Sequence, residues 1–274
     1  MTRPYAEVIG DPIGHSKSPL IHNFWLGKLR IDAEYRTERV ILDTLHDYLA
    51  KRRRDPAWRG CNVTMPLKQY VAPLVDAVDP LAARVGAINT IVAGRDGLSG
   101  CNSDVAGFIE PLAELVGKGG HAALYGTGGA ARAIAVALAD AGFRIVIHGR
   151  TVERAHVLAA MIGSGIGATG MSDPTFPGVA NSSSCLIVNA TSLGMIGQPP
   201  LPISLAALPP TTFVYEIVTS PRDTPLLIDA RARGMCSFDG LQMLIGQAAV
   251  AFGRFFGEHA PRECDAELRE RLLA

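Results

Sequence analysis

The chain is 274 residues long and carries 26 basic and 26 acidic residues, so it has no net charge at neutral pH. This balance removes the electrostatic case for nucleic acid or an anionic membrane as the main partner, and a small molecule is the expected ligand. No apolar run approaches the length that crosses a bilayer, and the 5 scattered cysteines have no zinc-like spacing. We therefore expect a soluble, cytoplasmic protein with reduced thiols and no metal site.

The first hundred residues alternate between strand and helix patterns. Strands are predicted over 5–10, 34–41, 60–64 and 87–92, and helices are predicted from Ser18, over 42–51 and, with a proline break, over 71–85. Such alternation favours a largely parallel sheet covered by helices. A further helix is predicted over 105–116, after which the pattern starts again at Ala122, and we place a domain junction near residue 105.

The second half opens with a strand, a glycine turn, a helix and another strand. The turn contains Gly126, Gly128, Gly129 and Ala130, the helix runs to about Ala141, and the next strand covers 144–148. This order is typical of a dinucleotide-binding unit, in which glycines allow a tight turn and a close backbone approach to the pyrophosphate. Because the third glycine of the usual fingerprint is replaced, a glycine-rich helix start without a ligand is the alternative.

The residues after the strand at 144–148 bear on the choice of cofactor. No carboxylate stands at the strand end, where enzymes that use NAD usually hold the ribose hydroxyls. Arg150, Thr151 and Arg154 can instead bind a 2′-phosphate by charge-assisted hydrogen bonds, which favours NADP. The alternatives are that the arginines form a solvated helix face, or that Glu153 approaches the ribose.

A short apolar strand breaks at Pro66, just before a lone lysine, Lys68. Such a lysine can serve chemistry, although an exposed lysine is the commoner case. Here the surrounding motifs decide. The chain resembles the shikimate dehydrogenase family, which includes shikimate and quinate/shikimate dehydrogenases, and the resemblance runs nearly end to end. The matching segments are 10–23, 62–68, 86–90, 102–107, 188–195 and 240–247.

The resemblance implies an α/β fold of two lobes with the active site in the cleft between them. Residues 1–104 would form an N-terminal α/β substrate domain with a mostly parallel sheet, completed by C-terminal helices over 240–274. Residues 105–239 would form a Rossmann-like domain that binds NADP, with NAD as a possible replacement.

The resemblance also assigns the site residues. Lys68 and Asp104 would manage the proton, whereas alone they would be read as an exposed lysine and a helix cap. Substrate contacts would come from Ser16 and Ser18, which bind the carboxylate, and from Thr64, Asn89, Tyr215 and Gln247. The cofactor would be bound by the glycine turn, by Arg150, Thr151 and Arg154, and by Asn189, Thr191 and Gly240.

The implied activity is the reversible, NADPH-dependent reduction of 3-dehydroshikimate to shikimate, a step of chorismate and aromatic amino acid biosynthesis. Within the family, the alternatives are an NAD-preferring quinate/shikimate dehydrogenase and a paralogue for a related cyclic hydroxy acid. Outside it, they are a non-catalytic, nucleotide-responsive binding protein and an enzyme with a tetrahydrofolate substrate. We expect a monomer or homodimer with no nucleic acid or membrane partner.

Several positions depart from the family pattern. They are Cys101, Ser103, Gly149, Glu216 and the pair at 219–220, which stands where a tyrosine-containing turn is common. These departures leave the proton-transfer pair intact but bear on the adenosine contacts and on the loop near the nicotinamide. Cys101 also gives a hypothesis: its alkylation should inhibit, and substrate should protect, unless the thiol is buried and inert.

Overall fold

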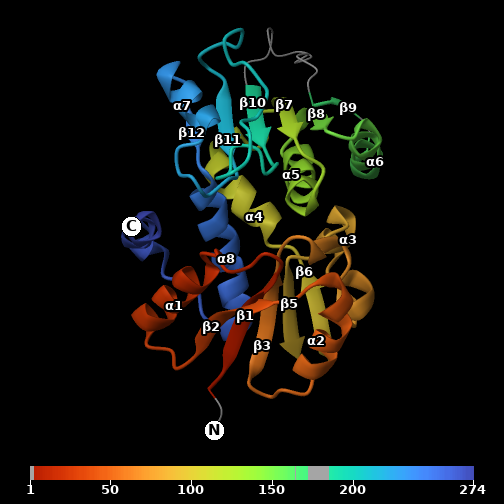
Figure 1. Cartoon of the computed structure of the whole chain (residues 1–274), viewed down its shortest axis with the longest axis vertical. Helices are drawn as coiled ribbons and strands as arrows, with labels where there is room; N and C mark the ends of the chain where they lie inside the picture. The colour runs from red at the N-terminus through yellow and green to blue at the C-terminus, as the bar shows by residue number, and fades with distance from the viewer. Residues whose placement is uncertain (1–2, 164, 172–184) are drawn as a thin grey trace. The chain divides into compact units, whose positions relative to one another are not determined.

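The computed structural model describes residues 3–163, 165–171 and 185–274, which fall into two compact units (Figure 1). The first unit contains the chain up to Gly107 and returns with Leu244–Ala274, and the second is Phe108–Met243. Each unit is built around its own sheet. The functional domain boundaries expected from the sequence, 104/105 and 239/240, stay a prediction.

The first unit contains a mixed sheet with the strand order β2-β1-β3-β5-β6-β4. Its strands are β1 (Tyr5–Gly10), β2 (Glu34–Arg39), β3 (Trp58–Val63), β4 (Ala77–Val78), β5 (Thr90–Gly94) and β6 (Gly97–Cys101). β1 pairs in parallel with β2 and β3, whereas β5 is antiparallel to both of its neighbours. Every residue of β1 is buried, as expected for a central strand covered on both faces.

Short helices connect these strands. The α-helices of this part of the chain are α1 (Ser18–Leu29), α2 (Leu45–Arg52), α3 (Pro80–Val85), α8 (Gly240–Phe256) and α9 (Asp265–Leu273), with 3₁₀ turns η1 (Leu42–Thr44), η2 (Leu67–Gln69), η3 (Ala72–Leu74) and η6 (Arg262–Cys264). α3 has a complete set of end signals: Asp79 accepts a hydrogen bond from the Leu81 amide at its start, and Gly86 ends it with φ = 65°. The α8 helix belongs to the second unit up to Met243 and to the first from Leu244.

The second unit contains a parallel sheet with the order β12-β11-β10-β7-β8-β9. Its strands are β7 (Gly120–Tyr125), β8 (Phe143–Gly149), β9 (Ile166–Gly170), β10 (Cys185–Asn189), β11 (Phe213–Glu216) and β12 (Ser237–Phe238). Its helices are α5 (Gly129–Asp140), α6 (Val152–Ile162) and α7 (Pro225–Ala232), preceded by α4 (Asp104–Ile109), which crosses the unit boundary, and η4 (Glu110–Leu115). This is the strand order of a doubly wound nucleotide-binding sheet, in which the order reverses between β7 and β10.

The fold class predicted from the sequence is confirmed: both units are α/β, and one has a Rossmann-like sheet. The prediction of helix over most of 71–85 is confirmed for α3 and the 3₁₀ turn η3, but the short strand β4 separates them. The antiparallel hairpin β5–β6 was missed as well. Its turn is Arg95-Asp96 between Gly94 and Gly97, and Asp-Gly at a tight turn is a hairpin signal that the sequence carries.

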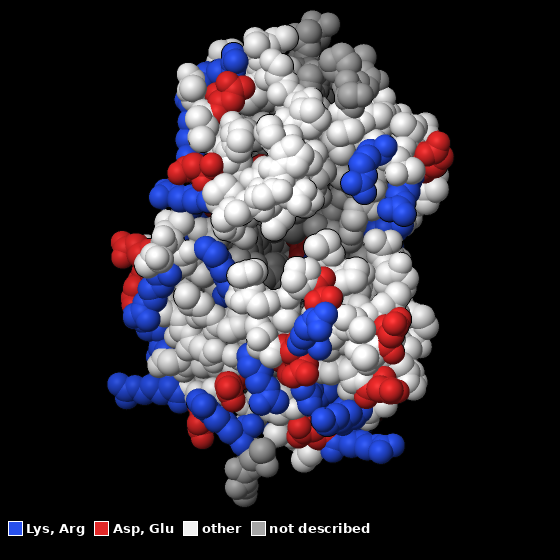
Figure 2. Space-filling model, viewed as in Figure 1, with Lys and Arg blue, Asp and Glu red and all other residues white. Residues whose placement is uncertain are grey.

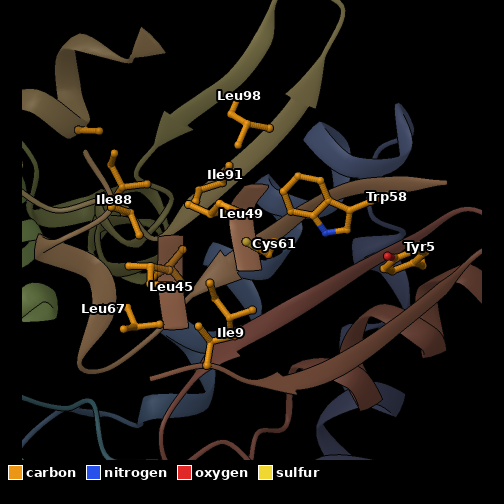
Figure 3. Packing of buried hydrophobic residues seen from close by; sticks show 14 of the residues in the cluster. Tyr5, Ile9, Leu45, Leu49, Trp58, Cys61, Leu67, Ile88, Ile91 and Leu98 are labelled. Atoms are coloured by element: carbon orange, nitrogen blue, oxygen red, sulfur yellow. The ribbon is translucent and has the colours of Figure 1, made fainter. Parts of the chain in front are cut away.

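A hydrophobic cluster in the first unit includes Leu67 and Ile88, whose side chains are 0% and 1% exposed. Figure 3 shows both among packed side chains from β1, β3, β5 and α2. Each is the sequence neighbour of a predicted site residue, Lys68 or Asn89. Because a close-packed interior resists displacement of its side chains, this core fixes the backbone from which both site residues project.

A polar cluster, here called the Glu7 cluster, is buried in the same unit and consists of Glu7, Arg36, Tyr48 and Arg52. The Glu7 carboxylate is 0% exposed and accepts hydrogen bonds from Arg52 Nε at 2.5 Å, Arg52 Nη2 at 3.2 Å and the Tyr48 hydroxyl at 2.6 Å. Arg36 Nε lies 3.5 Å from the second carboxylate oxygen. Both oxygens therefore have a cationic partner, as a buried charge requires.

The surface charge agrees with the balanced composition. Figure 2 shows basic and acidic side chains interspersed on the visible face of the first unit, without a broad field of one sign. Within the residues that the structure describes, no helix is both long and apolar enough to span a membrane.

Candidate functional site

Lys68 and Asp104 form an ion pair in the first unit. Lys68 lies in η2, just after β3, and its Nζ is 2.5 Å from Asp104 Oδ2. The side chains are 16% and 6% exposed. Asp104 is the first residue of α4, and the Asn102 side chain caps this end by accepting hydrogen bonds from the Asp104 and Val105 amides at 3.0 and 3.4 Å. The lysine makes one hydrogen bond among the described residues, so its other N–H groups can meet a ligand.

Asn89 holds the other oxygen of the Asp104 carboxylate. Its Nδ2 donates to Asp104 Oδ1 at 2.8 Å and to Ser103 Oγ at 2.9 Å, while its Oδ1 accepts from the Ser103 amide at 2.7 Å. The backbone amide can only donate, so it fixes which way the side-chain amide of Asn89 faces. Both Nδ2 hydrogens are engaged, and a substrate hydroxyl would share or replace one of these contacts.

The backbone locks these segments together. The Ile88 amide donates to the Lys68 carbonyl at 2.8 Å, and the Val63 amide donates to the Asn89 carbonyl at 2.7 Å. Since Leu67 and Ile88 are also packed in the core, the backbone beside Lys68 and Asn89 is held in place.

Gln247 joins the same group from α8. Its Oε1 accepts a hydrogen bond from Ser103 Oγ at 3.4 Å, and its Nε2 donates to the Leu244 carbonyl at 2.9 Å. The residue is only 8% exposed. Lys68, Asp104, Asn89 and Gln247, which stand far apart in the sequence, are therefore brought together in the first unit.

Thr64 lies against the start of the turn that carries Ser16 and Ser18. A Cβ placed on Gly10 would come within 2.5 Å of Thr64 Cγ2, so glycine is required there for the two segments to approach. Ser16 Oγ accepts a hydrogen bond from the Ser18 amide at 3.3 Å. Within the described chain neither serine hydroxyl donates a hydrogen bond, so both can donate to a carboxylate.

Tyr215 lies in β11 of the second unit. Its side chain is 0% exposed, and its ring stacks on Phe108 with a centroid distance of 4.7 Å. Burial raises the pKa of its hydroxyl far above the ordinary value. These contacts pack the ring, whereas the hydroxyl has no hydrogen-bond partner in the described structure, and the substrate contact expected from the sequence stays a prediction.

The glycine turn lies where the order of the parallel sheet reverses. Gly126 follows β7 with φ = 121°, and a Cβ there would come within 2.6 Å of the Ala190 carbonyl oxygen, which follows β10. Gly128 is the N-cap of α5, and a Cβ there would meet no atom within 4 Å. Gly128 is thus exposed at a helix start, an arrangement that binds phosphate.

Arg150, Thr151 and Arg154 gather at the start of the next helix. Arg150 and Thr151 follow β8, Thr151 is the N-cap of α6, and all three side chains are exposed. Two cations and a hydroxyl beside a helix N-terminus suit a phosphate monoester. Gly149 packs closely here, because a Cβ would come within 3.1 Å of Ala155 Cβ, so the departure at 149 has a packing reason.

Asn189 uses its side chain inside the protein. Its Nδ2 donates to the Leu193 carbonyl at 2.9 Å and to Glu216 Oε2 at 3.0 Å, and its Oδ1 accepts from Thr191 Oγ1 at 2.7 Å and from the Thr191 amide at 3.1 Å. Direct cofactor contacts from Asn189 and Thr191 stay predictions. Their visible role is to shape the loop after β10.

The structure explains the residue type at two further positions of the second unit, Glu216 and Gly240. Glu216 is 0% exposed and also accepts from the Val218 amide and Thr224 Oγ1, both at 3.0 Å. Burial raises the pKa of Glu216. Glycine is needed at 240, the first residue of α8, because a Cβ would come within 2.5 Å of the Ile217 carbonyl oxygen.

Cys101 is 4% exposed, and burial raises the pKa of its thiol to about 11. Both facts favour the inert thiol over the reactive one. Sequence reasoning gave no role to Asn62 and Thr90, which are hydrogen-bonded to each other and to Asn89. The available signal was a polar side chain inside an apolar strand, since such a group must find a partner when buried.

Comparison with known proteins shows similarity to shikimate dehydrogenases over nearly the whole chain. The shikimate dehydrogenase substrate binding domain model matches residues 8–91, and the shikimate 5'-dehydrogenase C-terminal domain model matches residues 240–267. The chain is 50% identical over 273 residues to a Sphingopyxis alaskensis protein named shikimate dehydrogenase (NADP(+)), covering 99% of this chain and 97% of that protein.

Solved structures agree. Thermus thermophilus shikimate 5-dehydrogenase, in complex with NADP(H) and shikimate, is 34% identical with a TM-score of 0.86, covering 98% of this chain and 100% of the other. Quinate dehydrogenase from Corynebacterium glutamicum, in complex with NAD, is 28% identical with a TM-score of 0.85, covering 99% of each chain.

Proposed function

Because this chain belongs to the shikimate dehydrogenase family, we propose that it interconverts 3-dehydroshikimate and shikimate with NADP(H). The observation that carries the proposal is the Lys68–Asp104 pair, held 2.5 Å apart on a rigid part of the first unit. A pair of this kind is what the oxidation of a secondary alcohol needs, since a proton must leave the hydroxyl as a hydride leaves the carbon.

Lys68 supplies the proton path. In the reducing direction its ammonium donates a proton to the oxygen of the forming alcohol, and in the oxidising direction its amine accepts that proton. Asp104 orients the lysine through Oδ2 and is itself held through Oδ1 by Asn89. The carboxylate also compensates the lysine charge at a position where the lysine side chain is only 16% exposed.

Substrate binding follows from the donors nearby. Ser16 and Ser18 offer two hydroxyl donors to the substrate carboxylate, and Thr64, Asn89 and Gln247 offer groups for the ring hydroxyls. The contacts of Asn89 and Gln247 with Ser103 and Asp104 support this role, because they hold the side chains beside the proton-transfer pair.

NADP fits the second unit. When bound, it supplies the hydride acceptor and, as NADPH, the hydride donor. The turn from Gly126 to Ala130 would bind its pyrophosphate, and Arg150, Thr151 and Arg154 would bind its 2′-phosphate. The absence of a carboxylate at 149–151 supports NADP over NAD, as does the cofactor named for the relative that shares 50% identity.

We also infer a cytoplasmic location and a monomeric or homodimeric state. All the cysteines lie in the described residues and are free thiols, which suits a reducing compartment. Size-exclusion chromatography with light scattering would measure the oligomeric state directly.

Steady-state absorbance of the reduced nicotinamide tests the proposal with shikimate or quinate, each with NADP or NAD. We expect the highest kcat/KM with shikimate and NADP. A preference for quinate with NAD would assign the chain the activity named for the Corynebacterium relative. Inactivity with all four pairs would reject the proposal and favour the specialised or non-catalytic alternatives.

A further inference from the structure

Tyr35 is a buried tyrosine in β2, the edge strand of the first unit's sheet. Its side chain is 1% exposed, and its ring stacks on His22 of α1 with a centroid distance of 3.9 Å and an interplanar angle of 4°. The hydroxyl donates a 2.6 Å hydrogen bond to Asn62 Oδ1. Nothing derived above for catalysis uses this residue.

The hydrogen bond from Tyr35 sets the orientation of Asn62. Because Oδ1 faces the tyrosine, Nδ2 faces the other way and donates to Thr90 Oγ1 at 3.0 Å and to the Asn89 carbonyl at 3.3 Å. Asn62 and Thr90 are directly opposed in the antiparallel pairing of β3 and β5, so the sheet holds their side chains close together.

Thr90 connects the Asn62 side chain to the Asn89 side chain. Its oxygen already accepts from Asn62, so its hydroxyl proton is directed to Asn89 Oδ1, 2.9 Å away. Asn89 Oδ1 then receives Thr90 Oγ1 and the Ser103 amide together. Asn89 Nδ2 is left to face Asp104 Oδ1, and Asp104 Oδ2 faces Lys68.

We propose that Tyr35 is a positioning residue for the reaction, acting through Asn62 and Thr90 on the Asn89 side chain that holds Asp104. This inference rests on the proposed function and deepens it. Without the hydroxyl, the 3.3 Å hydrogen bond from Nδ2 to the Asn89 carbonyl is the one contact left that opposes a turn of the Asn62 oxygen toward Thr90. Thr90 would then donate to Asn62 instead of Asn89, and Asn89 Oδ1 would lose one of its three donors, keeping the Ser103 amide at 2.7 Å and Ser103 Oγ at 3.3 Å.

The burial of Tyr35 suits this role. Burial raises the pKa of the phenol well above its ordinary value of 10.0, so the hydroxyl remains a donor throughout the working range of an enzyme. Each link joins buried groups in a medium of low dielectric, where hydrogen bonds polarise one another and a lost partner is costly.

The Glu7 cluster supplies a matched control. The Tyr48 hydroxyl also donates a 2.6 Å hydrogen bond in the first unit, to Glu7 Oε1, and burial raises the pKa of Tyr48 as well. Within the described residues, no hydrogen bond links the Glu7 cluster to Asp104. Tyr35→Phe and Tyr48→Phe thus remove the same group and leave the ring in place.

The first experiment measures kcat, KM for shikimate and urea unfolding for both variants. We expect both to lose stability, but only Tyr35→Phe to lower kcat, by about 3- to 10-fold, with KM changed less. In a Thr90→Val background, the effect of Tyr35→Phe on kcat should largely disappear, because the link to Asn89 is already cut. Equal kcat for the two tyrosine variants, or full additivity with Thr90→Val, would overturn the proposal.

A second readout does not depend on activity. In protein labelled with ¹⁵N-asparagine, Tyr35→Phe should shift the side-chain amide signals of both Asn62 and Asn89, and Tyr48→Phe should shift neither. A shift confined to Asn62 would overturn the proposal. The spectrum decides the positioning role even if the wild-type protein does not turn over shikimate, a result that would reject the proposed function instead.

Discussion

The first unit buries two carboxylates, Glu7 and Asp104, and pairs each with a cation, but the two surroundings differ. Glu7 is 0% exposed, is held by Tyr48 and both arginines, and uses two nitrogens of Arg52. Asp104 meets a lysine that makes one hydrogen bond within the described chain and is 16% exposed. In the first arrangement the cations are arginines, which do not give up their proton. The second keeps a proton donor for a ligand.

Arginine and lysine suit these two roles. The guanidinium of Arg52 is planar, stays charged and binds a carboxylate with a fork of donors, which favours a closed structural pair. The ammonium of Lys68 can give up its proton, which an acid–base group must do. We therefore expect replacement of the carboxylate by an amide to lower kcat at Asp104 and to lower stability at Glu7.

The largest expected effect comes from Asp104→Asn. The amide has the same shape but no charge to orient Lys68, and one of its two atoms would present N–H groups to the donors of Lys68 or Asn89. We expect kcat with shikimate and NADP to fall by about 10²- to 10⁴-fold, with a small change in the urea midpoint. A fall below threefold would contradict the role given to this carboxylate.

The corresponding substitution in the Glu7 cluster, Glu7→Gln, should lower the stability of the fold. It leaves Arg52 buried without its main counter-charge, although Glu38 stays 3.5 Å from Arg52 Nη2. We expect a loss of about 3 kcal/mol in the free energy of unfolding, and an unchanged kcat for the protein that remains folded. Urea titration and steady-state assays on one preparation measure both. A kcat loss matching that of Asp104→Asn would remove the distinction between the clusters.

A third buried ionisable group, His22, has no hydrogen-bond partner at either ring nitrogen in the described structure. Burial lowers the pKa of His22 from 6.5 to about 3. The unfolded chain takes up a proton below its ordinary pKa and the folded chain does not, so stability is lost as pH falls from about 6.5 to about 3. The slope is about 1.4 kcal/mol per pH unit.

His22→Phe keeps the ring against Tyr35 and removes the titration. The unfolding free energy of the wild type, relative to this variant, should decline as pH falls from about 6 to about 4. Urea titrations at several pH values check this. A constant difference across that range would show that His22 takes up its proton in the folded protein as readily as in the unfolded chain.

The smallest expected effect concerns the thiols near Glu7 and near Asn89. Burial raises the pKa of Cys61, near Glu7, and of Cys101, whose carbonyl accepts from the Asn89 amide. Cys236 is exposed. Iodoacetamide should label Cys236 in the native protein, leave Cys61 and Cys101 unmodified and preserve activity, as mass mapping and an assay would show. Rapid inactivation with substrate protection would restore the hypothesis of a reactive Cys101.

The sequence predicted the α/β architecture and the glycine turn, and it singled out Lys68 and Asp104, which form an ion pair in the structure. These features depend on local patterns: strand periodicity, glycine at a helix start and motif residues beside short strands. The missed features need pairing between distant segments. Tyr35 contacts Asn62 across 27 residues and Ser103 contacts Gln247 across 144, and no local signal specifies either contact.

Motif membership also did not distinguish ligand contacts from internal ones. Asn189 and Thr191 bond to each other in the loop after β10, and Tyr215 packs on Phe108. Their side chains satisfy buried polar groups or fill a core, which becomes visible only when the neighbours are known.

The central claim is that the Lys68 amine itself moves the substrate proton. Turnover of Lys68→Ala with shikimate and NADP, measured with and without methylamine, tests it most directly. We predict a loss of about 10²- to 10⁴-fold in kcat, partly restored in proportion to the free amine, with no such restoration in Asp104→Asn. Lys68→Ala that turns over within threefold of the wild type without added amine would contradict the account.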